Sequence, residues 1–431
     1  MEPVPVLLPQ VFCAEKEGKW LLLNPEIPDW IVVNTNAALI LASLSHFHTV
    51  EDIARQHSIA EENVAALLEL AKQHSILEGS PPTRDATLRN AASSFLKSVH
   101  WKLTNACNLH CKYCYAESGK ATLTPQLGDL KQVAHDIQSF SPNASHTLSG
   151  GEPLLHPHAL EFGEHLRQQG CHVSLLTNGT LITRHNFRQI ASIFPYVKIS
   201  LDGSSEDIHA MTRGQGNHAT VMKAVDMLLE QDCDVAIAMT VHKHNQQDIA
   251  AMSERYGNRL VFQPFFNAGR GSLNNGLMLT GDEYYQALAC HEHISPLSRI
   301  EHTLNSLRGK GASRCSMAKH DISISETFDV YPCQLLTDKK FCAGNALETP
   351  VRTLLEHSDR FAKLRAINVD SIPKCSSCPI RYLCSGGCMA RNYSQTGRVD
   401  VCGDFCEYEQ QAIMAALFSC SMEDITISES S

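Results

Sequence analysis

The stretch TNACNLHCKYCYAES, residues 104–118, holds three cysteines, Cys107, Cys111 and Cys114, at a Cys-x3-Cys-x2-Cys spacing. Thiolates placed so close together are typical metal ligands, and the chain around them must fold so that all three face one centre. A zinc ion needs four ligands, as does a four-iron cluster held wholly by protein, and this motif supplies three. The fourth position is therefore either open to another molecule or filled by a distant side chain.

The chain has 431 residues and 17 cysteines. Its start, MEPVPVLLPQ, lacks the regions of a signal peptide, and the sequence contains no run of about 18 apolar residues. We therefore expect a cytoplasmic protein without a membrane partner, in a compartment where abundant cysteines indicate metal sites rather than disulfides. The formal net charge of −10 disfavours nucleic acid as a partner, because a phosphate backbone is bound by a basic surface.

The cysteines outside the first motif form two groups. Nine of them crowd between Cys315 and Cys406, which indicates a second metal-binding region. Five stand alone in apolar or helical contexts, and we expect these to be small buried hydrophobic residues: Cys13, Cys171, Cys233, Cys290 and Cys420.

Residues 1–80 have the pattern of a separate domain. VFCAEKEGKWLLLNPE and WIVVN predict two short strands around a turn, and three short helices follow. Ser58-x-x-Glu61 is a capping-box pattern that predicts the start of the last helix. That helix carries apolar residues at helical spacing: Val64, Leu67, Leu68 and Ala71. Two strands and three helices suggest a winged-helix-like domain, and its four Lys and Arg against eleven Asp and Glu, net −7, favour a protein or peptide ligand over DNA.

A polar, Pro-containing stretch at residues 81–96 is expected to be a linker, and after it strands alternate with helices. Six strands are predicted within residues 97–290: SVHWKLTN, HTLSGG, HVSLLTNG, YVKISLDG, DVAIAMTV and RLVFQPF. Strand–helix alternation implies parallel pairing, so the sequence predicts an α/β fold, a partial (β/α)6 barrel of TIM-like type. The cysteine loop and the polar segments 150–153, 177–179 and 200–203 then fall at the carboxyl ends of strands, where such barrels carry their chemistry.

The cysteine motif, with Tyr113 just before its last cysteine, resembles the signature of the radical S-adenosylmethionine (SAM) enzymes. The resemblance covers residues 97–270 and implies that the amine and carboxylate of SAM chelate the iron that lacks a protein ligand. Electron transfer from this [4Fe-4S] cluster would then cleave SAM to a 5′-deoxyadenosyl radical, which abstracts hydrogen from unactivated carbon. A zinc site with a distant fourth ligand is the alternative reading of the spacing.

Three further segments resemble positions that contact SAM in this family. The resemblance implies that the methionine amine contacts Gly150-Gly151-Glu152-Pro153. It implies that the ribose lies near Ser200 and Asp202, and that the carboxylate is reached by Arg213. The alternative for each segment is a purely structural role as turn residues or a surface cation.

KCSSCPIRYLCSGGCMAR resembles the SPASM extension of peptide-modifying radical SAM enzymes, which we place at residues 311–415 and which holds two auxiliary [4Fe-4S] clusters. The resemblance implies an outer cluster held by Cys375, Cys378, Cys384 and Cys406. It implies an inner cluster held by Cys315, Cys333 and Cys388. Cys402 lies close enough in sequence to compete with Cys406.

Two positions depart from the SPASM pattern. The family often has a further cysteine shortly before the position of Cys315, and HTLNSLRGKGASR contains none. It also has a glycine where this chain has Phe328. The missing cysteine predicts an open iron in the inner cluster, a soft site that suits a substrate thiolate, unless Cys342 closes it. A fully ligated cluster that only relays electrons is the alternative.

GKWLLLNPEIPDWIVVNTNAALIL followed by TVEDIA resembles PqqD, the small peptide-binding subunit of pyrroloquinoline quinone biosynthesis, and related domains fused to peptide maturases. The resemblance implies that residues 1–80 bind the leader of a precursor peptide by adding it as a strand to a sheet edge. The alternative is a domain that only caps the barrel.

Together these resemblances imply a radical SAM maturase that acts on a ribosomally made precursor peptide, with an electron donor such as flavodoxin or ferredoxin. The expected product is a thioether crosslink of the kind made by sactipeptide maturases. The alternatives are carbon–carbon crosslinking or another oxidative side-chain modification, and, in a different class, a non-enzymatic iron–sulfur sensor with a winged-helix module. The polar residues 421–431 are expected to form a flexible tail.

Overall fold

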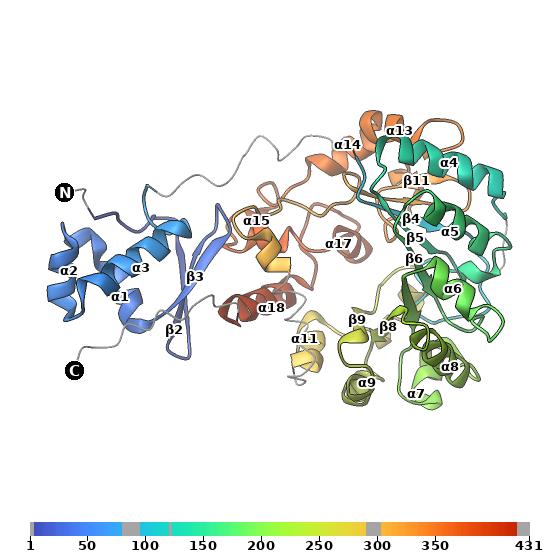
Figure 1. Ribbon diagram of the computed structural model, residues 1–431, viewed down its shortest axis with the longest axis horizontal. Coiled ribbons are helices and arrows are strands. Elements are labelled where there is room, and N and C mark those ends of the chain that lie inside the picture. The colour runs from blue at the N-terminus through green and yellow to red at the C-terminus, as the bar shows by residue number, and fades with distance from the viewer. Residues whose placement is uncertain (1–3, 80–94, 120–122, 290–302, 420–431) are drawn as a thin grey trace.

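The structure is a computed structural model that describes residues 4–79, 95–119, 123–289 and 303–419 (Figure 1). All but the last two residues of the expected linker at 81–96 lie outside the described residues, as do the expected tail at 421–431, Cys290 and Cys420. The described part is elongated, with the N-terminal strands and helices at one end and a large curved sheet at the other (Figure 1).

Residues 4–79 contain a three-stranded antiparallel sheet, β1 (Phe12–Lys16), β2 (Lys19–Asn24) and β3 (Asp29–Asn34), in that order. The first predicted strand is a hairpin, because Glu17 and Gly18 have φ of 53° and 77°, the left-handed values that a tight two-residue turn requires. The sequence analysis predicted two strands in this region, and the structure has three. Cys13 was also predicted wrongly: it lies on β1 between two half-buried residues, and the period of two along a strand turns its side chain to solvent.

Three helices cover this sheet, as expected: α1 (Thr35–Ser43), α2 (Val50–His57) and α3 (Glu61–Gln73). The four apolar residues predicted for the last helix are all buried in α3. Ser58 does not cap α3. It has φ of 53° and ends α2, and the backbone of Ala60 precedes α3 instead.

The six predicted barrel strands form one parallel sheet in sequence order, which confirms the α/β fold with a partial barrel. Their bounds are β4 (Ser98–Lys102), β5 (Ser145–Ser149), β6 (Val173–Thr177), β7 (Tyr196–Ser200), β8 (Asp234–Val241) and β9 (Leu260–Pro264). Along β4, Val99 and Trp101 belong to the apolar core, whereas His100 and Lys102 line cavities on the other face. The isolated Cys171 and Cys233 are buried, as predicted.

Helices cover the outer face of this sheet (Figure 1). They are α4 (Leu127–Phe140), α5 (Ala159–Gln168), α6 (Phe187–Ile193), α7 (Glu206–Arg213), α8 (His218–Leu229) and α9 (Ile249–Tyr256). Two further helices, α10 (Arg270–Leu273) and α11 (Gly281–Ala289), follow β9. None of the helices in the described part of the chain is long and apolar enough to cross a membrane.

The C-terminal region extends the barrel sheet, which the sequence did not predict. β10 (Asp321–Ile324) pairs parallel with β4, and β11 (Asp329–Tyr331) and β12 (Gly344–Asn345) follow antiparallel, so that the sheet has nine strands within the described residues. The helices of this region are α13 (Val351–His357), α14 (Asp359–Ala366), α15 (Pro373–Ser376), α16 (Arg381–Cys384), α17 (Met389–Thr396) and α18 (Cys406–Ser419).

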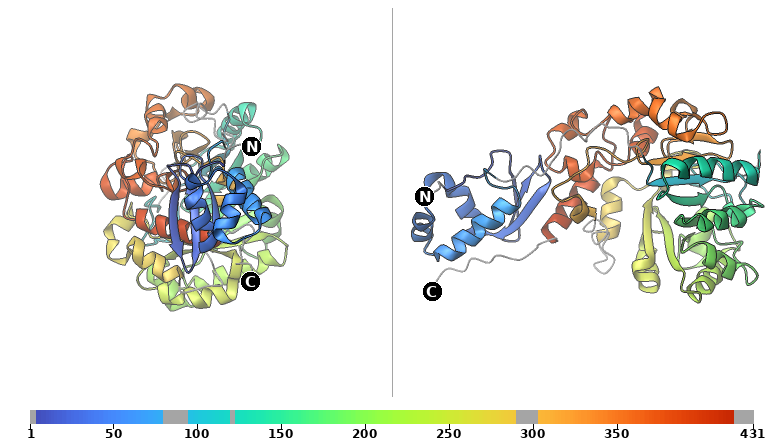
Figure 2. Two further views of the ribbon diagram at one scale, coloured as in Figure 1. Left: turned by 90° about the vertical axis from the view of Figure 1, so that its left-hand side faces the viewer. Right: turned by 45° about the horizontal axis from the view of Figure 1, so that its top comes forward.

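The N-terminal sheet packs on this C-terminal region, which lies between it and the barrel (Figure 2). Leu21, Leu23 and Trp30 form one buried cluster with Leu383 of α16 and Leu417 of α18. Two ion pairs flank the cluster: Arg308 Nε lies 2.7 Å from Asp29 Oδ1, and Arg381 pairs with Glu26 of the β2–β3 turn. The N-terminal unit is therefore seated on the helices that carry the last cysteines.

Candidate active site

The cysteine loop follows β4 and is held at both ends by the backbone. Cys107 N–H donates to Gly119 O (2.8 Å), and Lys112 N–H donates to Thr212 O (2.9 Å). Arg270, at the start of α10, donates from Nε to Cys111 O (3.0 Å) and from Nη1 to Ser118 O (2.7 Å). Arg270 thus holds the cysteine loop from the segment that follows β9, the last barrel strand. Its position after the last predicted strand is the only feature of the sequence that points to this role.

The three thiols of this loop are suited to a soft metal centre. Burial raises the pKa of Cys111 to about 11 and raises the pKa of Cys107, so both are neutral until a metal displaces the proton. Arg213 Nη1 lies 4.0 Å from Cys111 Sγ and supplies a positive charge beside the thiolates. Among the described residues, no group of three or more His, Cys, Asp and Glu converges tightly enough to hold a single metal ion.

The glycines after β5 lie where the cysteine loop touches the sheet. Gly151 N–H donates to Thr104 O (2.8 Å), and a Cβ on Gly151 would stand 2.2 Å from Ala106 O. Gly150 has φ of 151°, and a Cβ there would stand 2.5 Å from Thr104 O. Both positions need glycine because the backbone of the loop occupies the space of a side chain.

Glu152 ties the cysteine loop to the end of β6. Its fully buried carboxylate accepts hydrogen bonds from Thr177 Oγ1 (2.8 Å) and from the N–H groups of Asn178 (2.8 Å) and Leu154 (3.1 Å). Burial outweighs these bonds and raises the pKa of Glu152 to about 7. Asn178 Nδ2 in turn donates to Asn108 Oδ1 (2.9 Å) in the cysteine loop. Pro153 is buried and opens a short 3-10 turn, Pro153–Leu155.

Asp202 and Arg213 form a buried ion pair behind the cysteine loop. Asp202 Oδ2 accepts from Arg213 Nε (2.7 Å), Tyr113 Oη (2.6 Å) and Thr212 Oγ1 (3.0 Å), and its Oδ1 accepts from Thr240 N–H (3.0 Å). Although burial raises the pKa of Asp202, the Arg213 guanidinium and these bonds hold it below its ordinary value. With four protein donors, Asp202 is placed to orient Tyr113 and Arg213. Ser200, the last residue of β7, is partly exposed.

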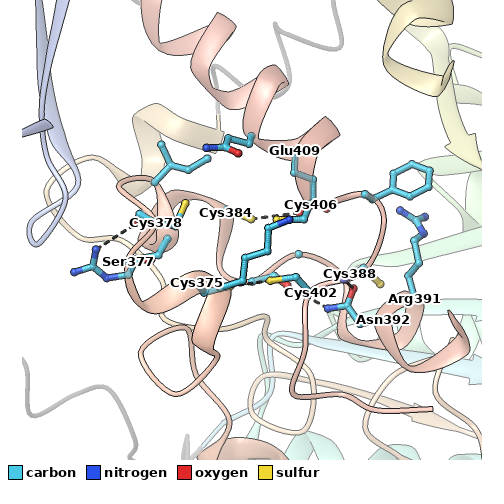
Figure 3. A pocket seen from close by; sticks show the side chains of 18 of the residues that line it. Cys375, Ser377, Cys378, Cys384, Cys388, Arg391, Asn392, Cys402, Cys406 and Glu409 are labelled. Atoms are coloured by element: carbon cyan, nitrogen blue, oxygen red, sulfur yellow. Dashed lines mark hydrogen bonds between the residues drawn. The ribbon is translucent and has the colours of Figure 1, made fainter. Parts of the chain in front are cut away.

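A cavity of about 240 Å³ in the C-terminal region is lined by six cysteines (Figure 3): Cys375, Cys378, Cys384, Cys388, Cys402 and Cys406. A single water needs about 15 Å³ of such space, so the cavity has room for a cluster. Cys375 Sγ lies 3.2 Å from Cys402 Sγ, and Cys384 donates to Glu409 Oε2 (3.3 Å). The structure therefore brings together the four cysteines assigned to the outer cluster and places Cys402 among them.

Cys315, Cys333 and Cys388, the residues assigned to the inner cluster, come together from three segments. Burial is the main reason that the pKa of Cys333 is raised to about 12, and the neighbouring Cys388 and Cys315 raise it as well. The buried thiol of Cys342 instead donates to Gly344 O (3.5 Å). An open position in the inner cluster remains a prediction.

Arg314 is a buried cation beside the inner cysteines that the sequence analysis missed. Its Nη2 donates to Met317 O (2.9 Å), while its buried Nε and Nη1 have no hydrogen-bond partner. Burial raises the pKa of Cys315 and the charge of Arg314 opposes that shift, so a thiolate-bound cluster would offset the buried cation. Phe328, at the family's glycine position, is buried and keeps the left-handed backbone that glycine favours, with φ of 64°.

Comparisons with known proteins agree with this arrangement. Residues 101–255 match the radical SAM superfamily, and residues 315–379 match the SPASM family, an iron–sulfur cluster-binding domain. The mycofactocin maturase MftC of Mycobacterium ulcerans is 28% identical over 324 residues, which cover 68% of this chain and 83% of MftC. The AdoMet-dependent heme synthase of Methanosarcina barkeri is 26% identical, covering 69% and 93% of the two chains. The subtilosin biosynthesis protein AlbA of Bacillus subtilis is 23% identical and covers 78% of both.

Two solved structures share the fold. The structure of anSMEcpe with bound AdoMet superposes with a TM-score of 0.62 at 20% identity, covering 76% of this chain and 94% of that one. Streptococcus suis SuiB bound to SAM has a TM-score of 0.56 at 14% identity and covers 93% and 99%. The matched domains imply a [4Fe-4S] cluster that binds SAM and auxiliary clusters, and the cysteine groups described above supply thiolates for them. The chain is therefore a radical SAM enzyme with a C-terminal SPASM domain.

Proposed function

We propose that this enzyme modifies a ribosomally made precursor peptide by joining a cysteine sulfur to a carbon atom of the same peptide. The names of two relatives, a mycofactocin maturase and a bacteriocin biosynthesis protein, support the substrate class. SuiB, which has the same fold, has been solved with its precursor peptide SuiA. The observation that supports the thioether is the inner group of three cysteines, Cys315, Cys333 and Cys388, while the Cys342 thiol donates to Gly344 O.

The residues of this chain divide the work between the cysteine loop and the inner cysteine group. With SAM bound, the cluster of the cysteine loop supplies the radical that removes hydrogen from carbon. Arg270 and Glu152 hold that loop, and Asp202 orients Tyr113 and Arg213 beside it. Cys315, Cys333 and Cys388 would hold the inner cluster, which would supply a soft iron to bind the substrate thiolate. Forming the C–S bond removes one hydrogen atom from carbon and one proton from sulfur, and auxiliary clusters held by these cysteines would accept the remaining electron.

The N-terminal sheet is the proposed docking site for the leader of the precursor. Within residues 4–79, β1 and β3 each pair with β2 alone, so a strand can be added at an outer edge of the sheet; at the start of β3, Arg308 already donates to Trp30 O. Hydrogen exchange of the full chain with and without a leader peptide tests this step. Added protection confined to the amides of β1 or β3 is the expected result, and unchanged exchange in both strands would contradict leader docking by strand addition.

The proposed function is tested by co-expressing the protein anaerobically with a candidate precursor and measuring the intact mass of the peptide before and after thiol alkylation. A loss of two hydrogens per linkage, with a matching number of cysteines that resist alkylation, is expected for thioethers. The same loss with every cysteine alkylated would show carbon–carbon coupling. A Cys333→Ala variant that still formed the thioether would exclude sulfur ligation by the inner group.

A further inference from the structure

Two cavities on the concave face of the sheet connect the cysteine loop with the inner cysteine group. The first, of about 290 Å³, touches Tyr115 just after Cys114 and Gly150 of the glycine segment, and we call it the loop-side cavity. The second, of about 280 Å³, is lined by Cys333, and we call it the cluster-side cavity. His100 and Gln334 line both. A substrate that occupied both cavities would contact these two side chains.

His100 has an unused polar atom at this position. The residue lies in the middle of β4 with only 9% of its surface exposed, and its Nδ1 lies 3.5 Å from Ser323 Oγ. Its Nε2 is buried and has no hydrogen-bond partner. A buried polar group without a partner is unfavourable, so a partner that arrives with the substrate would recover the free energy lost when Nε2 was removed from water.

An unpartnered nitrogen is not sufficient evidence of a site, as His146 shows. His146 Nε2 is also buried without a partner, but its Nδ1 accepts a hydrogen bond from Trp101 Nε1 (3.0 Å) in the apolar core on the other face of the sheet. His146 lines neither of the two cavities. His100 differs because its side chain borders both of them.

The walls of both cavities are polar and carry charges of both signs: Glu117 lines the loop-side cavity beside Lys102 and Glu326, and Lys198 and Asp321 line the cluster-side cavity. Lys102 and Glu326 of the loop-side cavity neutralise each other at 3.2 Å. The cluster-side cavity adds the hydroxyls of Thr147 and Ser174. Amide, hydroxyl and imidazole groups match the N–H and C=O groups of a peptide backbone, whereas an apolar substrate would leave them unpaired.

We propose that His100 binds substrate, with Nε2 hydrogen-bonded to the backbone of the core peptide beside the residue that loses hydrogen. Gln334 completes the contact from the C-terminal region. His100 and Gln334 therefore select which residue of the peptide is attacked, because they bind the peptide backbone beside it. This inference rests on the peptide substrate of the proposed function.

The test compares His100→Leu, which keeps bulk without a polar atom, with His100→Gln, which keeps an amide. The readouts are the ratio of modified peptide to 5′-deoxyadenosine and the KM for the peptide. His100→Leu is expected to lower the ratio at least tenfold and raise KM, and His100→Gln is expected to lie between it and the wild type. Iron content and peptide-free SAM cleavage should be unchanged. His172→Leu, at an exposed histidine before β6, is the matched control.

Gln334→Leu tests the same position without altering β4. If His100→Leu binds less iron than the wild type, the Gln334→Leu variant is used to test the substrate contact instead. A ratio within twofold of wild type in every iron-replete variant would overturn the role of His100. If the wild type itself leaves the peptide unmodified, the proposed function fails. If the wild type and all variants modify it equally, only this inference fails.

Discussion

Close backbone contacts at single residues decide how the cysteine loop is held. Gly150 and Gly151 allow the loop to lie directly on the end of β5, with hydrogen bonds from Gly151 N–H to Thr104 O and from Glu152 N–H to Ala106 O (both 2.8 Å). A side chain at either glycine would push the loop away from the sheet. The GGEP segment is therefore explained by contact with the loop, whatever it also contributes to SAM binding.

Replacing Gly151 with Ala tests this contact. The new Cβ would meet Ala106 O at 2.2 Å, and relief of the clash would displace the loop at a cost of about 1–3 kcal/mol. We expect about four fewer iron atoms per chain after reconstitution, the content of one cluster. Gly128→Ala in α4, where no atom lies within 4 Å of the added Cβ, should bind iron like the wild type. Full iron content in Gly151→Ala would show that the loop tolerates displacement.

Replacing Asp202 with Asn should strongly destabilise the protein. The change removes the charge that balances buried Arg213, and breaking a buried pair in this way costs about 3–5 kcal/mol. Glu51→Gln breaks the exposed pair with Arg55 on α2 and should cost about 0.3–0.5 kcal/mol. Chemical unfolding monitored by circular dichroism compares the two variants. Equal midpoints would mean that water or another group compensates Arg213.

The hairpin of β10 and β11 carries one of the two departures from the family pattern, Phe328. Phe328 adopts φ of 64° in the turn, where an L-residue with a bulky side chain is strained by about 1–2 kcal/mol. Its ring is 3% exposed and packs in the main core. Burial of the ring stabilises the hairpin by more than the turn costs, which explains how this chain dispenses with glycine.

Two variants separate these opposing contributions. Phe328→Ala loses the ring and keeps the strain, whereas Phe328→Gly loses both. We expect both to unfold more easily than the wild type, with Phe328→Gly the more stable of the two by about 1 kcal/mol. At ordinary positions alanine is favoured over glycine by about 0.5–1 kcal/mol, so the order of the two thermal midpoints is the test. Alanine above glycine would mean that the turn relaxes on substitution.

At the level of the whole chain, the N-terminal unit is joined to the region of the outer cysteine group. Arg381 Nη1 donates to Cys378 O (3.1 Å), and the same guanidinium pairs with Glu26 in the β2–β3 turn. Arg308 lies over the Trp30 ring at 4.4 Å and pairs with Asp29. These contacts set the direction from which a peptide docked on the N-terminal sheet approaches the rest of the enzyme.

Replacing Arg308 with Ala should loosen this arrangement. The variant loses a charge-assisted hydrogen bond to Asp29, worth about 1.5–3 kcal/mol, together with the stacking on Trp30. Small-angle X-ray scattering should show a larger radius of gyration and a broader distance distribution, with iron content unchanged. Arg352→Ala, which breaks an exposed pair with Glu356, is the control. Identical scattering from both variants would show that apolar packing alone seats the N-terminal unit.

Patterns between near neighbours along the chain were sufficient to predict the six barrel strands, the apolar face of α3 and the two closely spaced cysteine motifs, whereas the assignment of Cys315, Cys333 and Cys388 to one inner set came from the family resemblance. Such features follow from side-chain periodicity and ligand spacing, which act over a few residues. Local patterns failed where two local solutions compete. Ser58 could cap α3 or end α2, and the stretch at residues 12–24 could be one strand or a hairpin around Gly18.

Tertiary structure alone decided the contacts between distant segments. The parallel pairing of β10 with β4 joins residues more than 200 positions apart, and neither strand signals its partner, because backbone hydrogen bonds carry no sequence identity. Tertiary contacts also give three side chains their surroundings: Arg270, which bonds to the cysteine loop, Arg314 beside the inner cysteines, and His100 between two cavities. A charge or an imidazole becomes distinctive only when folding removes water from it, and which residues are buried together is a property of the complete fold.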